Sequence, residues 1–306
     1  MHPPIRFFVH EQTESSASVV LEFPRDGDVA ALTGRLVGPH CQVARTLPAD
    51  FSFKKTTLPA NLPEALSYLN GVTWYKTQVI DPCYWTPELP FLYDLQLAVE
   101  FEDGSSVDRQ LRVGLTRWGP QWRDLRLENR RIVLRGASIE QPTVDVIPAA
   151  RDASSALLIT QYDDSFCAAA DQAGVIVGLD LRNVADSIDS ILTRLDFSPS
   201  VFLVIVDPDR HRSADFQGRL ASHCIVADCL SPRATAEDYA NSSTVVAFEL
   251  DADERPPSWL SMSSRPVIAI RRGKDYADLV EARAACDRLQ AELAPEFDLA
   301  GYFVAL

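Results

Sequence analysis

The chain has 306 residues, of which 43 are acidic and 29 basic, and a formal net charge of −14. Nucleic-acid binding needs a basic face that displaces counterions from phosphates, so this charge argues against a nucleic-acid partner. No apolar run approaches the ~20 residues of a membrane span, and the N-terminal segment lacks the apolar core of a signal peptide. We therefore expect a soluble protein without a membrane partner, of unknown compartment, more often two domains than one.

The six cysteines are scattered along the chain, with neither a CxxC pair nor the spacing of metal ligands. Free thiols are the expected state, because small apolar cysteines are common in protein cores. No Gly-rich phosphate loop is present, and the histidines are not spaced as metal ligands. The sequence accordingly predicts no metal and no cofactor.

Residues 1–125 have the pattern of an antiparallel β domain. Apolar and polar residues alternate from Leu95 to Phe101, as in a strand with one buried face, and Asp103-Gly104 follows as a hairpin turn. Similar β-rich segments are separated by Pro and Gly, which favours a two-sheet sandwich. The predicted strands are 19–23, 31–37, 66–74, 95–101 and 107–115.

Residues 126–306 change to short apolar runs separated by helical stretches. The runs are 132–134, 156–159, 175–177, 201–206, 224–226, 244–248, 267–270 and 302–306. Eight strands of this kind, buried on both faces, are the number that closes a (β/α)8 barrel. The helical stretches are 164–173, 184–195, 236–240 and 276–293. Because the region is short for such a barrel, the alternatives are abbreviated helices or an open, doubly wound sheet.

Three motifs connect the two regions. Trp85-Thr-Pro-Glu-Leu-Pro-Phe-Leu-Tyr93, Arg112-Val-Gly-Leu115 and Arg130-Arg-Ile-Val-Leu-Arg-Gly136 follow one another in that order. Together they resemble the end of the immunoglobulin-like domain and the entry into the catalytic barrel of glycoside hydrolase family 2, the β-galactosidase and β-glucuronidase family. The resemblance implies an immunoglobulin-like sandwich in residues 1–125 and a compact, degenerate (β/α)8 TIM-type barrel in residues 126–306.

The resemblance also marks where catalytic and sugar-binding groups should lie. At the fourth barrel strand, where the family carries its acid/base glutamate, the matching position holds Asp209. At the seventh strand, where the family carries its nucleophile, the position holds Arg271. Tyr162 and Gln161 follow the second strand at the family's sugar-contacting loop, and Asp180 is the acid nearest the end of the third. These last three are the predicted substrate-binding residues.

These substitutions bear directly on the chemistry. A retaining glycosidase needs one ionised and one protonated carboxyl group, and a guanidinium can serve as neither. A cation at a strand end must also be paired, so we expect Arg271 to form an ion pair with Asp209, Glu249 or Asp251 across the barrel mouth. Glu249 and Asp251 are at the same time alternative carboxylates for catalysis, because both follow the sixth strand.

Three hypotheses for function follow. The first is a non-catalytic or impaired relative of the family, a pseudoenzyme that binds a carbohydrate or a protein partner. The second is an active O-glycosyl hydrolase that uses Asp209 with Glu249 or Asp251. The third is a structural scaffold whose acidic face docks a partner. A mouth filled by ion-paired side chains would favour the first and third hypotheses over the second.

Overall fold

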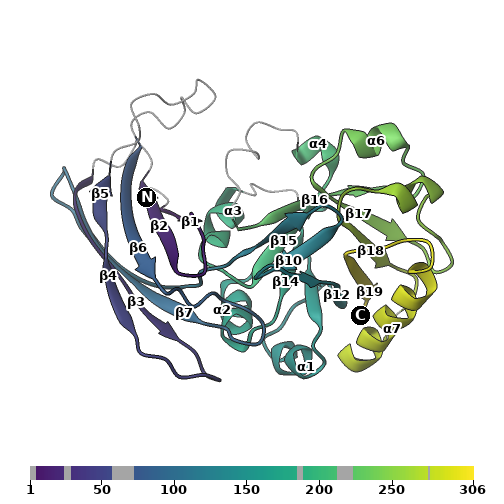
Figure 1. The fold of residues 1–306 in the computed structure, drawn as a ribbon, viewed down its shortest axis with the longest axis horizontal. Coiled ribbons are helices and arrows are strands. Elements are labelled where there is room, and N and C mark those ends of the chain that lie inside the picture. Colours follow the sequence, from purple (N-terminus) through teal and green to yellow (C-terminus); the bar gives the residue numbers. More distant parts are fainter. Residues whose placement is uncertain (1–4, 24–28, 57–71, 185–188, 212–222, 275) are drawn as a thin grey trace. The chain divides into compact units, whose positions relative to one another are not determined.

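The computed structural model describes residues 5–23, 29–56, 72–184, 189–211, 223–274 and 276–306 (Figure 1). The chain divides into two compact units. The first contains the residues up to Thr116 together with Leu192–Pro199, and the second begins at Arg117. The second unit therefore includes a small antiparallel sheet that spans residue 125, the predicted boundary. This sheet has the order β11-β10-β9, with the strands β9 Trp118–Gln121, β10 Asp124–Leu127 and β11 Arg130–Ile132.

The first unit is built from two antiparallel four-stranded sheets. One has the order β1-β2-β6-β5 and the other β4-β3-β7-β8. If β4 is left out of the lettering, the two sheets have the orders A-B-E-D and C-F-G, which is the strand order of immunoglobulin-type sandwiches, and β4 lies at the edge of the second sheet. The strands are β1 Arg6–His10, β2 Ser16–Phe23, β3 Val29–His40, β4 Ala49–Ser52, β5 Lys54–Thr56, β6 Thr73–Ile80, β7 Leu92–Phe101 and β8 Ser106–Val113.

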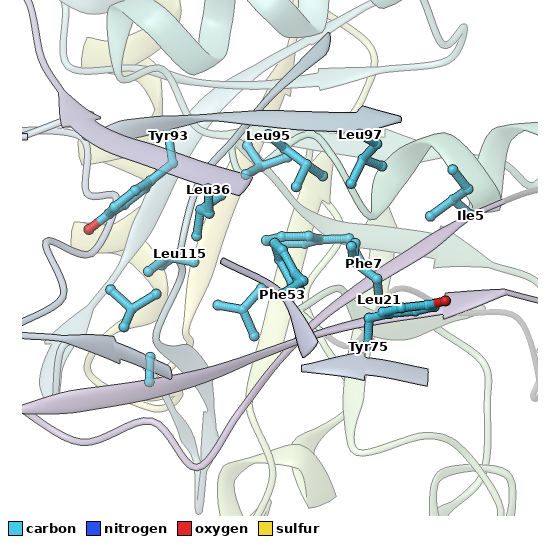
Figure 2. Close-up of a cluster of buried hydrophobic side chains, with 14 of the residues drawn as sticks. Ile5, Phe7, Leu21, Leu36, Phe53, Tyr75, Tyr93, Leu95, Leu97 and Leu115 are labelled. Carbon is cyan, nitrogen blue, oxygen red and sulfur yellow. The ribbon is translucent and has the colours of Figure 1, made fainter. Parts of the chain in front are cut away.

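The core of this unit comes from the alternation that the sequence predicts. Leu95 and Leu97 of β7 are buried, and they share one hydrophobic cluster with Leu21 of β2 and Phe53 (Figure 2). The residues between them on β7 are at least partly exposed, as the period of two requires. The predicted strand 66–74 is only partly testable: residues 66–71 lie outside the described residues, and its last two residues are the first two of β6.

Tyr93 fixes the start of β7. Its side chain is fully buried, and its hydroxyl accepts a hydrogen bond of 2.9 Å from the backbone N–H of Cys83. A Cβ atom at Gly38 of β3 would lie 2.9 Å from Cδ1 of the Tyr93 ring, so only glycine allows this approach. This arrangement matches the tyrosine corner of immunoglobulin-like sandwiches. Tyr93 therefore connects β3 to the segment that precedes β7.

The second unit is a closed barrel of eight parallel strands (Figure 1). The first strand, β12, pairs with the last, β19, in a register that joins Leu134 to Gly301. The alternative of an open, doubly wound sheet is therefore wrong. The strands are β12 Leu134–Ile139, β13 Ala156–Ile159, β14 Val177–Asp180, β15 Val201–Val206, β16 Ile225–Leu230, β17 Val245–Leu250, β18 Val267–Arg271 and β19 Gly301–Ala305.

The helices around the barrel are short and do not alternate one to one with the strands. Between β17 and β18 the chain forms only a 3-10 helix, Ser258–Met262, so the barrel departs from a full (β/α)8 pattern at this connection. No described helix could cross a bilayer, given its length and polarity. The α-helices are α1 Val146–Asp152, α2 Asp164–Ala173, α3 Asp189–Leu195, α4 Pro208–His211, α6 Ala236–Ala240 and α7 Leu279–Leu293.

The two longest of these helices have clear end signals. Asp163 caps α2 by accepting a 2.7 Å hydrogen bond from the N–H of Phe166, and Gly174 ends the helix in the left-handed conformation with φ 73°. Asp278 caps α7 in the same way through the N–H of Glu281, at 2.8 Å. The predicted helix 164–173 coincides with α2, whereas the predicted helix 276–293 begins three residues before α7, which starts only after its cap Asp278.

The barrel interior is apolar up to the polar residues at the carboxyl ends of the strands. Residues from several strands form one cluster, which includes Leu203, Ala247, Ile270 and Phe303. The strand β10 contributes Leu125 to the same cluster, so the small sheet packs on the barrel core. This interior is a packed core of the kind that fills (β/α)8 barrels, and it positions the polar residues that follow at the strand ends.

Candidate functional site

The barrel mouth is the set of inward-facing residues at the carboxyl ends of the strands. Ala247 and Ile270 belong to the interior cluster, and Glu249 and Arg272 each follow one of them by two residues. Because side chains on a strand alternate with a period of two, Glu249 and Arg272 face the same interior. Asp180 ends β14 and is buried at this level.

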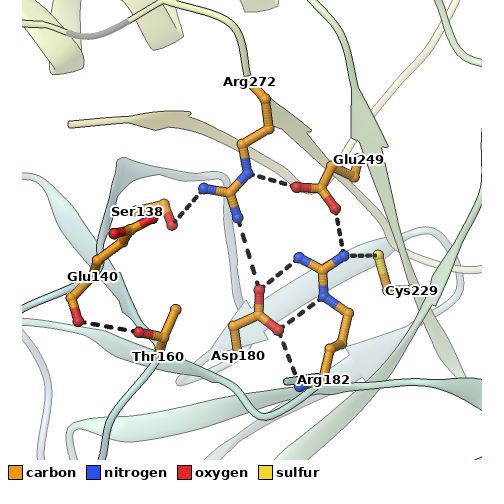
Figure 3. Close-up of polar contacts among 8 residues, drawn as sticks. All are labelled: Ser138, Glu140, Thr160, Asp180, Arg182, Cys229, Glu249 and Arg272. Atoms are coloured by element: carbon orange, nitrogen blue, oxygen red, sulfur yellow. Dashed lines mark hydrogen bonds and ion pairs between the residues drawn. The ribbon is translucent and has the colours of Figure 1, made fainter. Parts of the chain in front are cut away.

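Arg182 contacts Asp180, Glu249 and Cys229 at the barrel mouth (Figure 3). It binds Asp180 through two hydrogen bonds, Nε to Oδ1 at 2.8 Å and Nη2 to Oδ2 at 2.6 Å. Its Nη1 donates to Oε2 of Glu249 at 2.5 Å and to Sγ of Cys229 at 3.2 Å. The side chain of Arg182 is 13% exposed and that of Asp180 only 2%, so this is a largely buried, bidentate ion pair.

Arg272 reaches the same carboxylates from the opposite side. Its Nε donates to Oε1 of Glu249 at 2.6 Å, and its Nη2 lies 3.9 Å from Oδ2 of Asp180. Its Nη1 donates to Oγ of Ser138 at 3.2 Å. Asp180, Arg182, Glu249 and Arg272 thus form one connected set with two positive and two negative groups (Figure 3). We refer to these four residues as the mouth network.

The mouth network determines the protonation of its members. Burial by itself would raise the pKa of Glu249, but hydrogen bonds from Arg182 and Arg272 outweigh it and hold that pKa below its ordinary value. The hydrogen bond to Asp180 raises the pKa of Arg182. Burial raises the pKa of the Cys229 thiol to about 12, although Arg182 opposes this effect. Near neutral pH, Glu249 is therefore a carboxylate and Cys229 a thiol.

In the mouth network the arginines neutralise the carboxylates, and this leaves no group well suited to transfer a proton to a substrate. Each oxygen of Glu249 accepts a hydrogen bond from a guanidinium, and both oxygens of Asp180 are bound by Arg182. A guanidinium does not release its proton near neutral pH. No group of three or more His, Cys, Asp or Glu is arranged to hold a metal ion in the described part of the chain.

The predicted carboxylates separate into two groups. The structure brings Asp180 and Glu249 together in the mouth network, where both bind Arg182. Asp209 lies in the first turn of the short helix α4 and is exposed. Asp251 is also exposed, just after β17, and its backbone N–H donates to the Glu254 carboxylate at 3.1 Å. Neither Asp209 nor Asp251 is part of the mouth network.

The two predicted substrate-binding residues Gln161 and Tyr162 follow the carboxyl end of the second barrel strand. Gln161 is exposed and Tyr162 is half-buried, both just beyond β13. The preceding residue, Thr160, donates through its hydroxyl to the carbonyl of Glu140 at 3.1 Å (Figure 3). This bond links the segments that follow the first two strands of the barrel.

The predicted ion pair of Arg271 with Asp209, Glu249 or Asp251 is wrong. Arg271 binds Glu292 of α7, with Nη1 2.7 Å from Oε2, and donates to the carbonyl of Glu254 at 2.9 Å. The reason is strand parity. Ile270 faces the interior, so Arg271 faces the surrounding helix and Arg272 takes the inward position.

The prediction missed Arg182, Arg272, Cys229 and Ser138. The alternation of side chains along the strand could have identified Arg272, because Ile268, Ile270 and Arg272 are spaced by two residues and face the barrel interior. Arg182 lies beyond the last residue of β14, and no local pattern indicates that its side chain reaches across the mouth.

Comparisons with known proteins place the fold. No protein-family profile and no curated protein matches the sequence significantly. Solved structures do match: a glycosyl hydrolase family 2 member from Bacteroides cellulosilyticus has a TM-score of 0.65 at 13% identity, covering 99% of this chain and 43% of that one. The β-glucuronidase of Parabacteroides merdae gives 0.65 at 12%, covering 100% and 47%. The β-D-glucuronidase of Dictyoglomus thermophilum gives 0.63 at 11%, covering 98% and 61%.

The similarity extends along essentially the whole chain, whereas the chain spans only about half the length of these structures. At such low identity the match concerns the fold and not the chemistry. It agrees with the resemblance of the three motifs between Trp85 and Gly136. The chain therefore has the fold of glycoside hydrolase family 2, a β-sandwich unit and a closed parallel barrel.

Proposed function

We propose that this chain is a non-catalytic relative of the family 2 glycosidases, in which an immunoglobulin-like sandwich and a degenerate TIM-type barrel act in binding a carbohydrate or a protein partner. The observation that carries the proposal is the mouth network. Its two arginines lie at the carboxyl ends of the barrel strands, the face where enzymes of this barrel type carry their catalytic groups, and both are paired with the carboxylates there.

The protonation of the mouth network supports this proposal. Retaining hydrolysis requires a carboxylic acid that donates a proton to the leaving oxygen and a carboxylate that attacks the anomeric carbon. Glu249 has a lowered pKa, which disfavours the acid role, and both its oxygens are already hydrogen-bonded. The inward position after β18 holds Arg272, which can act neither as nucleophile nor as acid.

Binding remains chemically feasible at the same place. Glu249 is 36% exposed and Arg272 is 27% exposed, so both can still reach a ligand at the surface of the mouth network. A guanidinium can donate hydrogen bonds to sugar hydroxyls, and a carboxylate can accept hydrogen bonds from them. A partner protein with complementary charges could use the same groups.

The first test is an assay of the purified chain against aryl β-glucuronides, β-galactosides, β-mannosides and β-glucosides. We expect no turnover above buffer, and a β-glucuronidase of the same fold serves as the positive control. Turnover that copurifies with the chain and disappears in Asp209→Ala, Glu249→Gln or Asp251→Asn would establish the alternative of an active glycoside hydrolase with a non-standard carboxylate pair.

The second test addresses binding. Titration calorimetry with the methyl β-glycosides of the same four sugars should detect binding that weakens about tenfold in Glu249→Gln, since a hydrogen bond to a charged group contributes about 1.5 kcal/mol or more. Asp251→Asn is the matched control outside the mouth network. Equal weakening in both variants would place the sugar elsewhere, and the absence of any sugar binding would favour a protein partner.

A further inference from the structure

Two of the six thiols differ from the rest in their surroundings. Four sulfurs make a polar contact: Cys167 with the backbone at Asp163, Cys224 with the carbonyl of Val201, Cys229 with Arg182, and Cys286 with the carbonyl of Gly136. The sulfurs of Cys41 and Cys83 have no such contact with any residue that the structure describes. Both residues are reduced and half-buried, so small reagents can reach them.

Cys41 and Cys83 belong to the same corner of the sandwich unit. Cys41 directly follows His40, the last residue of β3, which pairs with Leu92 of β7. The backbone N–H of Cys83 binds the hydroxyl of Tyr93, whose ring lies against Gly38 of β3. The Tyr93 side chain therefore spans the distance from the end of β3 to the segment that carries Cys83.

The electrostatics of this corner agree with that placement. Burial raises the pKa of Cys83, and the charges of Asp81 and Cys41 raise it further. Neither cysteine is part of a strand, so the local backbone can adjust without loss of sheet hydrogen bonds.

We propose that Cys41 and Cys83 are an oxidisable pair that forms a disulfide by exchange with a small-molecule disulfide such as oxidised glutathione. In the first step the thiolate of one cysteine attacks the reagent, forms a mixed disulfide and expels one thiolate. In the second step the other cysteine attacks the protein sulfur and expels the second thiolate. The two protein thiols lose two protons and two electrons, and the reagent gains them as two thiols.

Either cysteine can make the first attack, and the other then resolves the mixed disulfide. Burial and Asp81 raise the pKa of Cys83, which lowers the fraction of its thiolate at neutral pH. The resulting bond encloses the chain between β3 and β7, including β4, β5 and β6, and it ties both ends of this segment around Tyr93.

The test uses the full chain, reduced and then exposed to oxidised glutathione under native conditions. After alkylation and digestion, mass spectrometry without reduction should recover a peptide pair joined through Cys41 and Cys83. The cross-link should raise the melting temperature by roughly 5–10 °C, as expected when a disulfide closes a long loop. Reductant should reverse both changes.

The matched controls are Cys41→Ser and Cys224→Ser. The first should lose the cross-link and the thermal shift and leave Cys83 free or as a mixed disulfide, whereas the second should retain both. The proposal is overturned if the wild-type chain yields Cys41 and Cys83 only as separate mixed disulfides or alkylated thiols. It is also overturned if either residue is cross-linked to a different cysteine. Both of these readouts come from the wild-type chain, so they do not depend on the folding of a variant.

Discussion

The core of the sandwich and the barrel mouth show two ways of building the inside of a protein. The sandwich core consists mainly of apolar side chains such as Leu36, Leu95 and Leu97, and it depends on volume and alternation. The mouth network depends on four particular charged residues at fixed distances. The comparison teaches that the fold and the chemistry at the strand ends depend on different residues, so the fold alone does not fix what the barrel mouth does.

Trp85→Ala should have the largest effect on the sandwich side of this comparison. Trp85 is fully buried, and its backbone N–H binds the carbonyl of Leu115 at 2.7 Å. Removing an aromatic side chain of this size leaves a cavity and should lower the free energy of unfolding by about 3–5 kcal/mol. Urea denaturation measures the loss, and Ile80→Ala, at a 58% exposed position, should change it by less than about 0.5 kcal/mol. If Trp85→Ala instead abolished sugar binding without loss of stability, Trp85 would be a sugar platform.

Arg182→Met should be the most damaging single change in the mouth network. It leaves Asp180 buried with the 3.9 Å contact to Arg272 as its nearest charge and the 3.3 Å hydrogen bond from the backbone N–H of residue 182, and removing one partner of a buried ion pair costs about 3 kcal/mol or more. Chemical denaturation checks this value. Arg255→Met is the control, because its pair with Glu296 is exposed and should contribute at most about 1 kcal/mol. Equal effects in the two variants would mean that the network is solvated.

The two regions should also respond to pH in opposite directions. Burial raises the pKa of Asp196 in the first unit to about 7, despite its 3.3 Å contact with Arg6. Since this pKa lies above the unfolded value of about 3.9, the stability it contributes is present at low pH and is lost as the pH rises from about 4 to about 7. The pKa of Glu249 is lowered, so its contribution is lost only as the pH falls below about 4.5.

Asp196→Asn isolates the first of these contributions. The slope of unfolding free energy against pH between 4 and 7 should become less negative by at most about 1.4 kcal/mol per pH unit. Denaturation curves at several pH values measure the slope, and Glu249→Gln should change the slope only in the acidic range. An unchanged slope in Asp196→Asn would show that the carboxyl group ionises normally in the folded chain.

Tyr93→Phe is the smallest of the expected effects. It keeps the buried ring and removes only the hydrogen bond to the N–H of Cys83, so the free energy of unfolding should fall by about 1 kcal/mol. A thermal melt of Tyr93→Phe beside Trp85→Ala compares a lost hydrogen bond with a lost core side chain in one unit. A loss of 3 kcal/mol or more in Tyr93→Phe would mean that the tyrosine corner orders a larger segment.

Local patterns predicted the buried strands better than the edges. The runs 156–159 and 201–206 and the helix 164–173 coincide with β13, β15 and α2, because each combines strong burial periodicity with turn or cap residues. The first barrel strand was placed at 132–134, whereas β12 runs from Leu134 to Ile139, because Gly136 and Ser138 interrupt its apolar pattern. The short strands β1, β4 and β5 were missed, and their exposed residues carry little periodic signal.

The candidate site was less predictable than the fold. Asp180 and Glu249 could be selected because acids follow two strands, but their partners could not. Arg182 and Arg272 are 90 residues apart in the sequence numbering, and only barrel closure brings them to the same two carboxylates. A one-residue error in strand parity was enough to assign the inward position to Arg271.

The pairing of β12 with β19 has a consequence for synthesis on the ribosome. β12 lies at residues 134–139 and its neighbour in the ring at 301–305, so one side of β12 has no native partner until β19 has been translated. The sandwich strands can pair much earlier, because chains fold from the N-terminus as they emerge. During that interval the nascent barrel presents an open edge, which is the state most exposed to aggregation and to chaperones.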